Sequence, residues 1–207
     1  MLSCRKNIDE FGIFCYNSKI EKREFGGKGE RMEQNIFREI SPLELENAMQ
    51  KIGKEWMLIT ARDEDNHRVN AMTASWGCLG VLWGKNICVC FVRPQRHTYE
   101  LLEKSERCSV AFLGEEYRSA LRLCGSKSGR DTDKLRDAGL HTDTLDGVDV
   151  IAEADTVLVC RKLYVDDLKK ECFLDPALLG NYAAEDYHRI YVCEIEKAYR
   201  KEREKSK

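Results

Sequence analysis

The sequence lacks the features that define several large classes of protein. No apolar run in its 207 residues approaches the length of a membrane span, and no secretory signal opens the chain. Lys and Arg (34 together) do not outnumber Asp and Glu (36), whereas general nucleic-acid-binding proteins carry a basic excess. We therefore expect a cytoplasmic protein with neither a membrane nor a nucleic acid as its partner.

A disulfide framework and a zinc site are also absent from the pattern, although cysteine is abundant. None of the ten cysteines forms a C-x-x-C pair, and a chain of this length without an export signal does not fit a small disulfide-stapled scaffold. Cys88 and Cys90 are two residues apart, so on a strand both side chains point to the same face, which suits packing rather than zinc binding. The pattern predicts mostly free, buried thiols and no metal site.

The first part of the chain differs in composition from the rest. Residues 17–34 are polar and contain Gly26-Gly27-Lys28-Gly29, which is typical of a linker. We predict a flexible extension over residues 1–34, one domain over 35–199 and a charged tail over 200–207. Met32 stands just before this domain, and we hypothesise that it is the native start.

Alternating and β-branched runs predict a mainly β fold with helices inserted between the strands. Strands are expected at residues 56–60, 68–76, 87–92, 108–113, 156–167 and 188–195. Helices are expected at residues 42–52, 97–104, 115–123 and 134–138, and a helical tail over 196–207. Loops are expected at residues 80–84, 125–129 and 143–155, and residues 169–174 are a further candidate for strand pairing. Six or more antiparallel strands suit a small closed Greek-key barrel.

Three stretches carry the chemistry of a binding site. Residues 70–77 (Asn-Ala-Met-Thr-Ala-Ser-Trp-Gly) end a strand in small and hydroxylated residues, so backbone amides can face a bound group beside a flat indole. Residues 92–99 are basic and hydroxylated, and residues 124–134 are rich in glycine, serine and positive charge. Together they predict a site for a flat aromatic ligand with a phosphate tail.

Each of these stretches also has a structural interpretation. Two surface arginines such as Arg93 and Arg96 more often form solvated salt bridges, but they flank Pro94 at the end of a buried strand, where ligand groups are commonly bound. The 125–129 loop by itself fits an ordinary turn better than a binding loop, and it lacks the spacing of a Walker motif. Core filling is the alternative role for Trp76, and Asn70, Thr73 and Ser75 can satisfy local backbone groups.

Four motifs in this order resemble the flavin reductase-like domain family, the FMN-binding split barrels that include flavoredoxin. They are N-x-M-T-x-[SA]-W-G from residue 70, R-x-x-R-x-T-Y from residue 93, S-G-R-D-x-D-K from residue 128 and H-x-x-Y-V-x-E-I from residue 188. The resemblance covers roughly residues 35–199. It implies a six-stranded antiparallel Greek-key split barrel, FMN as the cofactor and a homodimer with flavin near the subunit interface.

The resemblance also assigns the site residues, none of them as a catalytic group. The implied flavin-binding residues are Asn70, Met72, Thr73, Ala74, Ser75, Trp76, Arg93, Arg96, Thr98, Ser126, Ser128, Gly129, Lys134 and His188. Lys134 is expected at the phosphate or the ring, where a positive charge stabilises the anionic reduced flavin. His67 and His97 are interpreted as structural.

Three functions compete. The first is an FMN-dependent oxidoreductase or electron carrier that takes electrons from NAD(P)H or a ferredoxin-like partner; without a Rossmann fingerprint, nicotinamide would bind directly over the flavin. The second is a non-catalytic FMN-binding module, a flavin store or redox sensor. The third is a barrel that has lost flavin, which the intact arginine pair, serine loop and Lys134 disfavour.

Overall fold

A computed structural model describes residues 37–65 and 67–202. The predicted extension over residues 1–34 and the hypothetical start at Met32 therefore lie outside the described residues. Along the chain the elements are β1 (Phe37–Ile40), η1 (Pro42–Glu44), α1 (Ala48–Gln50), η2 (Lys51–Glu55), β2 (Met57–Asp63), β3 (Arg68–Ala74), β4 (Gly77–Leu82), β5 (Lys85–Val92), α2 (His97–Lys104), β6 (Arg107–Phe112), η3 (Glu115–Tyr117), α3 (Arg118–Ser126), α4 (Lys134–Asp137), β7 (Thr142–Leu145), β8 (Val148–Ile151), β9 (Thr156–Asp167), η4 (Lys170–Cys172), η5 (Pro176–Tyr182) and β10 (Arg189–Lys201).

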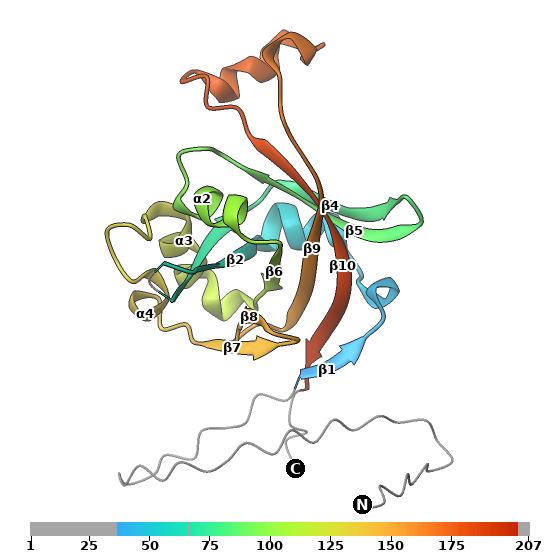
Figure 1. Cartoon of the computed structure of the whole chain (residues 1–207), viewed down its shortest axis with the longest axis vertical. Helices are drawn as coiled ribbons and strands as arrows, with labels where there is room; N and C mark the ends of the chain where they lie inside the picture. Colours follow the sequence, from blue (N-terminus) through green and yellow to red (C-terminus); the bar gives the residue numbers. More distant parts are fainter. Residues whose placement is uncertain (1–36, 66, 203–207) are drawn as a thin grey trace, which may run out of the picture. The chain divides into compact units, whose positions relative to one another are not determined.

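Eight of the described strands form one antiparallel sheet. Its order is β3-β2-β6-β9-β10-β5-β4, and β1 pairs with β10 beside this path. β7 and β8 form a separate hairpin. Figure 1 shows the long strands β9 and β10 bending through the centre, with α2, α3 and α4 on one side. The predicted mainly β fold with inserted helices is confirmed, and the main sheet has two strands more than the six expected.

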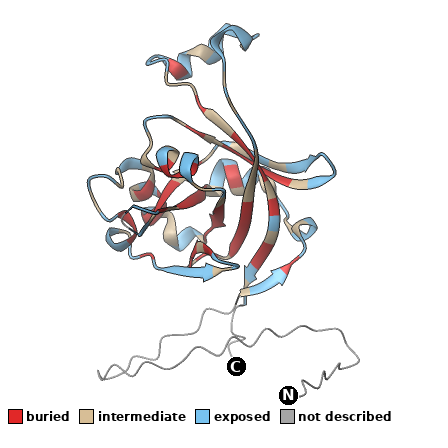
Figure 2. Cartoon of the chain, in the orientation of Figure 1, coloured by how far each residue is buried: buried red, intermediate tan, exposed pale blue. Residues whose placement is uncertain are grey.

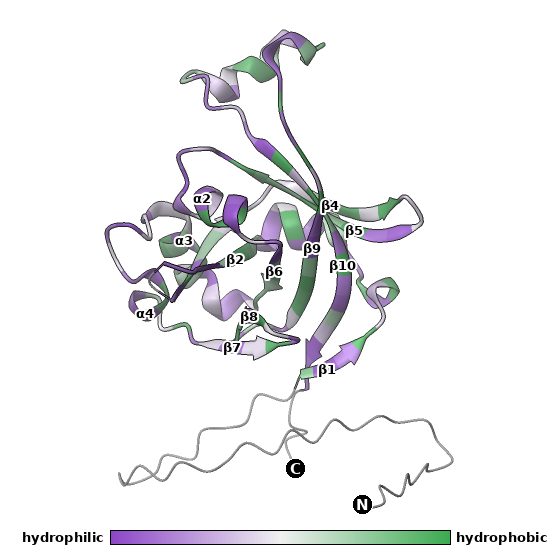
Figure 3. Ribbon diagram, in the orientation of Figure 1, coloured by the Kyte–Doolittle hydropathy of each residue, from purple (hydrophilic) through white to green (hydrophobic). Residues whose placement is uncertain are grey.

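β9 and β10 form the long ladder that carries both cores. The ladder extends from the pair Thr156–Arg200 to the pair Asp167–Arg189. Two register shifts, one on each strand, allow it to bend. Side chains alternate along β9, so Leu158 packs into one hydrophobic cluster while Val157 and its neighbour Val159 pack into the other. The first part of this strand, residues 156–160, is therefore buried on both faces, whereas its second part is half-buried or exposed. Figures 2 and 3 show a buried, hydrophobic stretch in β9, whereas β10 alternates between buried and more exposed residues.

Buried cysteines fill part of the first cluster. Cys88, Cys90, Cys108, Cys160 and Cys193 come from four different strands and all belong to it. All eight cysteines in the described ranges are free thiols, and only Cys78 and Cys172 are exposed. The prediction of mostly free, buried thiols is confirmed for this part of the chain.

Three of the strand and loop predictions are wrong, and two of the missed strand pairs are local hairpins. Residues 80–84 are not simply a loop: β4 runs to Leu82, and the turn falls at Trp83 and Gly84, both with positive φ. Residues 143–155 contain the β7–β8 hairpin instead of a loop. The expected helical tail is a strand as far as Lys201, because β10 pairs there with both β1 and β9.

The helix predictions differ from the structure mainly in extent. The capping box at Ser41 and Glu44 is present, but the following segment is divided between η1, α1 and η2. α3 continues to Ser126, so the predicted loop starts later than residue 125. Residues 169–174 do not pair as a strand and contain the short helix η4. α2 and α4 lie where they were expected, and Gly139, with φ +66°, follows the end of α4.

An arm formed by residues 168–188 joins β9 to β10. It contains η4 and η5 and projects from the end of these strands, where Figure 1 shows it in orange. Its outer residues Leu174 and Leu178 are exposed, while Tyr182 and His188 at its base are buried. The arm therefore places two buried polar aromatic side chains at one end of the sheet.

Candidate functional site

Two adjoining cavities lie at the end of β3, between the β5–α2 turn and the α3–α4 loop. The polar cavity has a volume of about 400 Å³ and the aromatic cavity one of about 170 Å³. Met72, Arg93 and Arg96 line both and join them into one site. The polar cavity is also lined by Gln95, His97, Thr98, Ser126, Lys127, Ser128, Gly129 and Lys134. The aromatic cavity is also lined by Thr73, Ala74, Ser75, Trp76, Phe91 and His188. Every predicted site residue except Asn70 therefore lines this site.

Close backbone packing shapes the chain where β3 ends. A Cβ atom at Gly77 would lie 2.6 Å from the carbonyl oxygen of Val89 and 2.9 Å from Cε of Met57, so only glycine fits there. The chain can then turn from β3 into β4 directly after Trp76. As a result the indole is 45% exposed at the rim of the aromatic cavity, and it does not fill the core.

Lys134 and Arg96 bring two positive charges to the polar cavity. Lys134 is only 5% exposed, and its Nζ donates to the carbonyl oxygen of Cys124 at 3.3 Å. Arg96 donates to the carbonyl oxygen of Gly125 at 2.6 Å. Burial lowers the pKa of Lys134, and the Arg96 guanidinium lowers it further, while the Cys124 thiol opposes the shift. Neither cation pairs with a carboxylate of the described residues, so an anion between them would relieve an unfavourable arrangement.

Arg93 behaves differently from Arg96. Its guanidinium forms an ion pair with Asp186, donates to the carbonyl oxygen of Asn181 at 2.8 Å and lies 5.2 Å from the ring centre of Tyr182. The Arg93 guanidinium also lowers the pKa of Asp186. The salt-bridge interpretation of Arg93 therefore holds alongside its place in both cavity walls, and its partners belong to the distant arm.

Gly129 brings the α3–α4 loop against β3 and α2. A Cβ at this position would overlap the side-chain oxygen of Asn70 and lie 3.1 Å from the ring of His97. Asn70 in turn donates to the hydroxyl of Thr98 at 2.7 Å. Asn70 lies just outside the joined site and lines a third cavity of about 680 Å³, which shares His97, Gly129 and Lys134 with the polar cavity.

The hydroxyl groups of the site also have protein partners. Thr73 donates to the carbonyl oxygen of Leu121 at 2.6 Å, and Ser126 donates to that of Leu123 at 3.3 Å. Ser128 accepts from the backbone N–H of Arg130 at 3.2 Å. Thr73 therefore satisfies a backbone group of the distant helix α3 and not a local one, and it lines the cavity wall as well.

His188 closes the aromatic cavity. Its ring centre lies 5.0 Å from that of Trp76 and 6.4 Å from that of Phe91. Burial lowers the pKa of His188 to about 4, and the Arg93 guanidinium acts in the same direction. The imidazole is consequently neutral at physiological pH.

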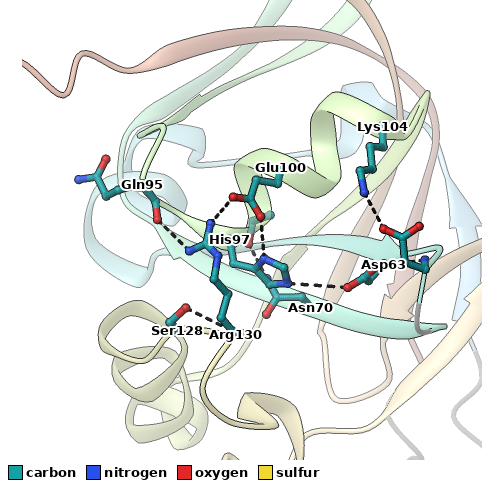
Figure 4. A network of polar contacts seen from close by, with 10 residues as sticks. Asp63, Asn70, Gln95, His97, Glu100, Lys104, Ser128 and Arg130 are labelled. Carbon is teal, nitrogen blue, oxygen red and sulfur yellow. Dashed lines mark hydrogen bonds and ion pairs between the residues drawn. The ribbon is translucent and has the colours of Figure 1, made fainter.

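Sequence reasoning missed four lining residues: Phe91, Gln95, His97 and Lys127. His97 was interpreted as structural, yet it lines the polar cavity between Glu100 at 3.4 Å and Asp63 at 3.9 Å. Figure 4 shows how the neighbouring Arg130 ties the loop to α2. Its guanidinium donates to Glu100 at 2.6 Å and to the carbonyl oxygen of Gln95 at 3.2 Å. All four residues stand inside or next to the motifs, and this proximity was the available signal.

The described residues contain neither a metal-binding cluster nor a membrane-spanning helix. No group of three or more His, Cys, Asp or Glu side chains in ranges 37–65 and 67–202 is arranged to hold a metal ion. No helix described there has both the length and the apolar character needed to cross a membrane.

The fold and the site together define a mainly β protein with a cation-lined pocket that continues into an aromatic one. The model of the flavin reductase like domain matches residues 49–207, so the chain belongs to this family. The predicted family is confirmed, and so is the prediction of a flavin cofactor at the level of the family. No curated protein sequence matches the chain.

Solved structures share this fold. An FMN-binding domain of a flavin reductase-like enzyme from Shewanella baltica OS155 has 18% identity and a TM-score of 0.59, covering 80% of this chain and 78% of that one. Flavoredoxin from Methanosarcina acetivorans has 21% identity and a TM-score of 0.55, covering 72% and 69%. The styrene monooxygenase flavin reductase from Pseudomonas putida S12 has 15% identity and a TM-score of 0.55, covering 72% and 81%. At these identities the likeness shows the fold.

The buried charge of Lys134 predicts a trade-off between stability and binding. In phosphate-free buffer at neutral pH, Lys134→Met should raise the free energy of unfolding by roughly 1 kcal/mol, because a buried charge without an anionic partner is removed. Since the pKa is lower in the folded state, this gain should be largest at neutral pH and shrink as the pH rises toward the ordinary lysine pKa of 10.5.

Urea denaturation at several pH values measures this effect. Lys127→Met is the matched control, because Lys127 lines the same cavity but is exposed. Its stability should change by less than about 0.5 kcal/mol. A Lys134→Met protein that is less stable than wild type at neutral pH would contradict the electrostatic account.

Proposed function

We propose that the chain binds FMN across the joined cavities and carries electrons between a reduced donor, NAD(P)H or a ferredoxin-like protein, and an acceptor. The observation that carries the proposal is the pair formed by the buried Lys134 and the half-buried Arg96, which lacks a carboxylate partner in the described structure and lines a cavity continuous with Trp76. Phosphate satisfies such a pair, and a flat ring suits the aromatic end. The protein is proposed to be cytoplasmic.

The residues present fit this cofactor. Lys134, Arg96 and the Ser126–Ser128 segment supply cations, hydroxyls and backbone N–H groups around the polar cavity, which are the groups that bind phosphate. The tight contact of Gly129 with Asn70 keeps the loop close to β3, so these groups converge. Trp76, Phe91 and Met72 offer the apolar surface that an isoalloxazine ring needs.

FMN would supply the hydride and electron chemistry, and the protein would supply position and electrostatics. Lys134 and Arg96 would hold the phosphate end. Trp76 and Phe91 would exclude water from one end of the ring, and the neutral His188 would add a hydrogen-bonding group there. No residue of the described chain is required to transfer a proton in this scheme.

Removing the charge of Arg96 should weaken the binding of FMN more than that of riboflavin. Arg96→Ala should weaken FMN by roughly tenfold or more, because a charge-assisted contact to phosphate is lost. Riboflavin, which has no phosphate, should lose less than about threefold. Fluorescence titration of both flavins measures the two dissociation constants, with Arg122→Ala as a control at an exposed arginine outside both cavities. Equal losses for FMN and riboflavin would exclude Arg96 from the phosphate site.

Turnover distinguishes electron transfer from flavin storage or sensing. The FMN-loaded protein should oxidise NADH, NADPH or a reduced ferredoxin. Under anaerobic conditions the flavin absorbance should decrease when the donor is added and return when an acceptor is added. A protein that releases FMN on denaturation but is not reduced by any of the three donors would favour the storage or sensing function. A colourless protein that also fails to bind added FMN would overturn the proposal.

A homodimer is also proposed, formed through the free edge of the sheet. β4 is the last strand in the sheet order, and Val81 (70% exposed) and Trp83 (59%) project from its end. The Trp83 ring contacts that of the exposed Tyr164 at 6.4 Å, which makes one apolar patch. Such a patch on an edge strand favours association, and it lies on the strand that follows Trp76.

A charge within this patch should dissociate the dimer. Val81→Glu is expected to give a monomer in light scattering where the wild-type protein is a dimer, because an interface charge would be left without a partner. Leu174→Glu is the control, since Leu174 is also exposed but lies at the outer end of the arm. A wild-type monomer would refute the dimer, and dissociation by Leu174→Glu alone would place the interface at the arm.

A further inference from the structure

The base of the arm brings a tyrosine hydroxyl to His188. Tyr182 ends η5 and is 6% exposed, and its hydroxyl lies 2.9 Å from Nδ1 of His188 in a buried contact. The two rings meet edge to face, with their centres 5.5 Å apart. His188 is thus fixed from behind by Tyr182, while Trp76 and Phe91 lie on its other sides.

His188 lines the aromatic cavity, and its second ring nitrogen, Nε2, is not the one that contacts Tyr182. Nε2 makes no hydrogen bond within the described residues. Among the described residues, Thr60 Oγ1 is the one fully buried side-chain nitrogen or oxygen atom without a partner. Nε2 of His188, which also has no partner, is therefore not fully buried. Since His188 is itself a lining residue of the aromatic cavity, Nε2 is its polar atom available to a ligand.

The hydrogen bond to Tyr182 determines which nitrogen carries the proton. Burial keeps the imidazole neutral, and the charged groups that act on it are Arg93, Asp186 and Arg96. A buried phenol hydroxyl needs an acceptor, and the Tyr182 hydroxyl has none in the described chain other than Nδ1 of His188. If Tyr182 donates to Nδ1, the single imidazole proton must reside on Nε2.

The geometry points to Tyr182 as a positioning residue that holds His188 in the Nε2–H tautomer, so that the aromatic cavity presents an N–H donor to a ligand carbonyl. This inference deepens the proposed function, on which the identity of that ligand rests. A neutral donor recognises carbonyl oxygens, such as those of a flavin pyrimidine ring or a carboxamide, and does not favour a bare cation.

Arg93 contributes to the same arrangement through the arm. Arg93 pairs with Asp186 and donates to Asn181, which lie on either side of Tyr182 in the chain, and its guanidinium lies over the Tyr182 ring. These contacts hold Tyr182 in place. An arginine that the motif suggested for phosphate binding therefore also fixes the residue that orients His188.

Nitrogen-15 NMR of labelled histidine tests the inference in the ligand-free protein. The chain has four histidines, and the His188 signals are those lost in His188→Gln. In the wild type at pH 7, Nε2 should be protonated, and Nδ1 should be unprotonated with the shift of a nitrogen that accepts a hydrogen bond. Tyr182→Phe should move the Nδ1 signal to that of a free unprotonated nitrogen and populate the second tautomer. Tyr187→Phe, which removes a hydroxyl from the ring stacked on Tyr182, should leave both signals unchanged.

Kinetics gives a second readout for a protein that turns over. Tyr182→Phe should lower kcat/KM for the donor roughly threefold to tenfold, as expected for one neutral hydrogen bond, and should change the FMN dissociation constant by less than about twofold.

Two results would overturn the inference. One is a wild-type His188 protonated on Nδ1, and the other is a Tyr182→Phe protein whose His188 signals match the wild type. Either result can occur in a protein that binds and reduces FMN normally. Conversely, a protein that shows the expected tautomer but neither binds nor reduces FMN would support the inference and contradict the proposed function.

Discussion

The pairing of β9 with β10 is the constraint on which the rest of the structure depends. This ladder contributes side chains to both hydrophobic clusters, and its neighbours β6 and β5 carry the two halves of the sheet. The arm is the connection between the two strands, so its base stands at a place that the ladder fixes. Because β10 also begins at the residue after His188, the same pairing sets the back wall of the aromatic cavity.

The cations of the site have two kinds of partner, which the sequence alone does not distinguish. Arg93 is neutralised by Asp186, whereas Arg96 and Lys134 are held on carbonyl oxygens and keep their charge available. Holding two cations together in a partly desolvated pocket lowers the stability of the ligand-free protein. Such a cost is typical of binding sites, where the ligand supplies the missing charge.

Local motifs predicted most of the site, because its residues come from short segments whose chemistry is contained in their own sequence. The turn after Val92, the loop before Lys134 and the small residues after Asn70 were recognised in this way. What could not be predicted depends on long-range contacts. Asp186 lies 93 residues from Arg93, the edge role of β1 and β4 follows from strand order, and the contact of Tyr182 with His188 requires the fold of the arm. The β7–β8 hairpin was missed because its alternation is short and interrupted.

The five thiols inside the first hydrophobic cluster give the fold an internal reporter. Cys88, Cys90, Cys108, Cys160 and Cys193 are each at most 3% exposed and sit on β5, β6, β9 and β10. A thiol reagent reaches them only when these strands separate, so the rate at which they react measures how often the centre of the sheet opens. Cys78 and Cys172, which are exposed in the described structure, provide the reference rate for unprotected thiols within the same molecule. The reactivity of its own thiols thus reports how often the described sheet opens.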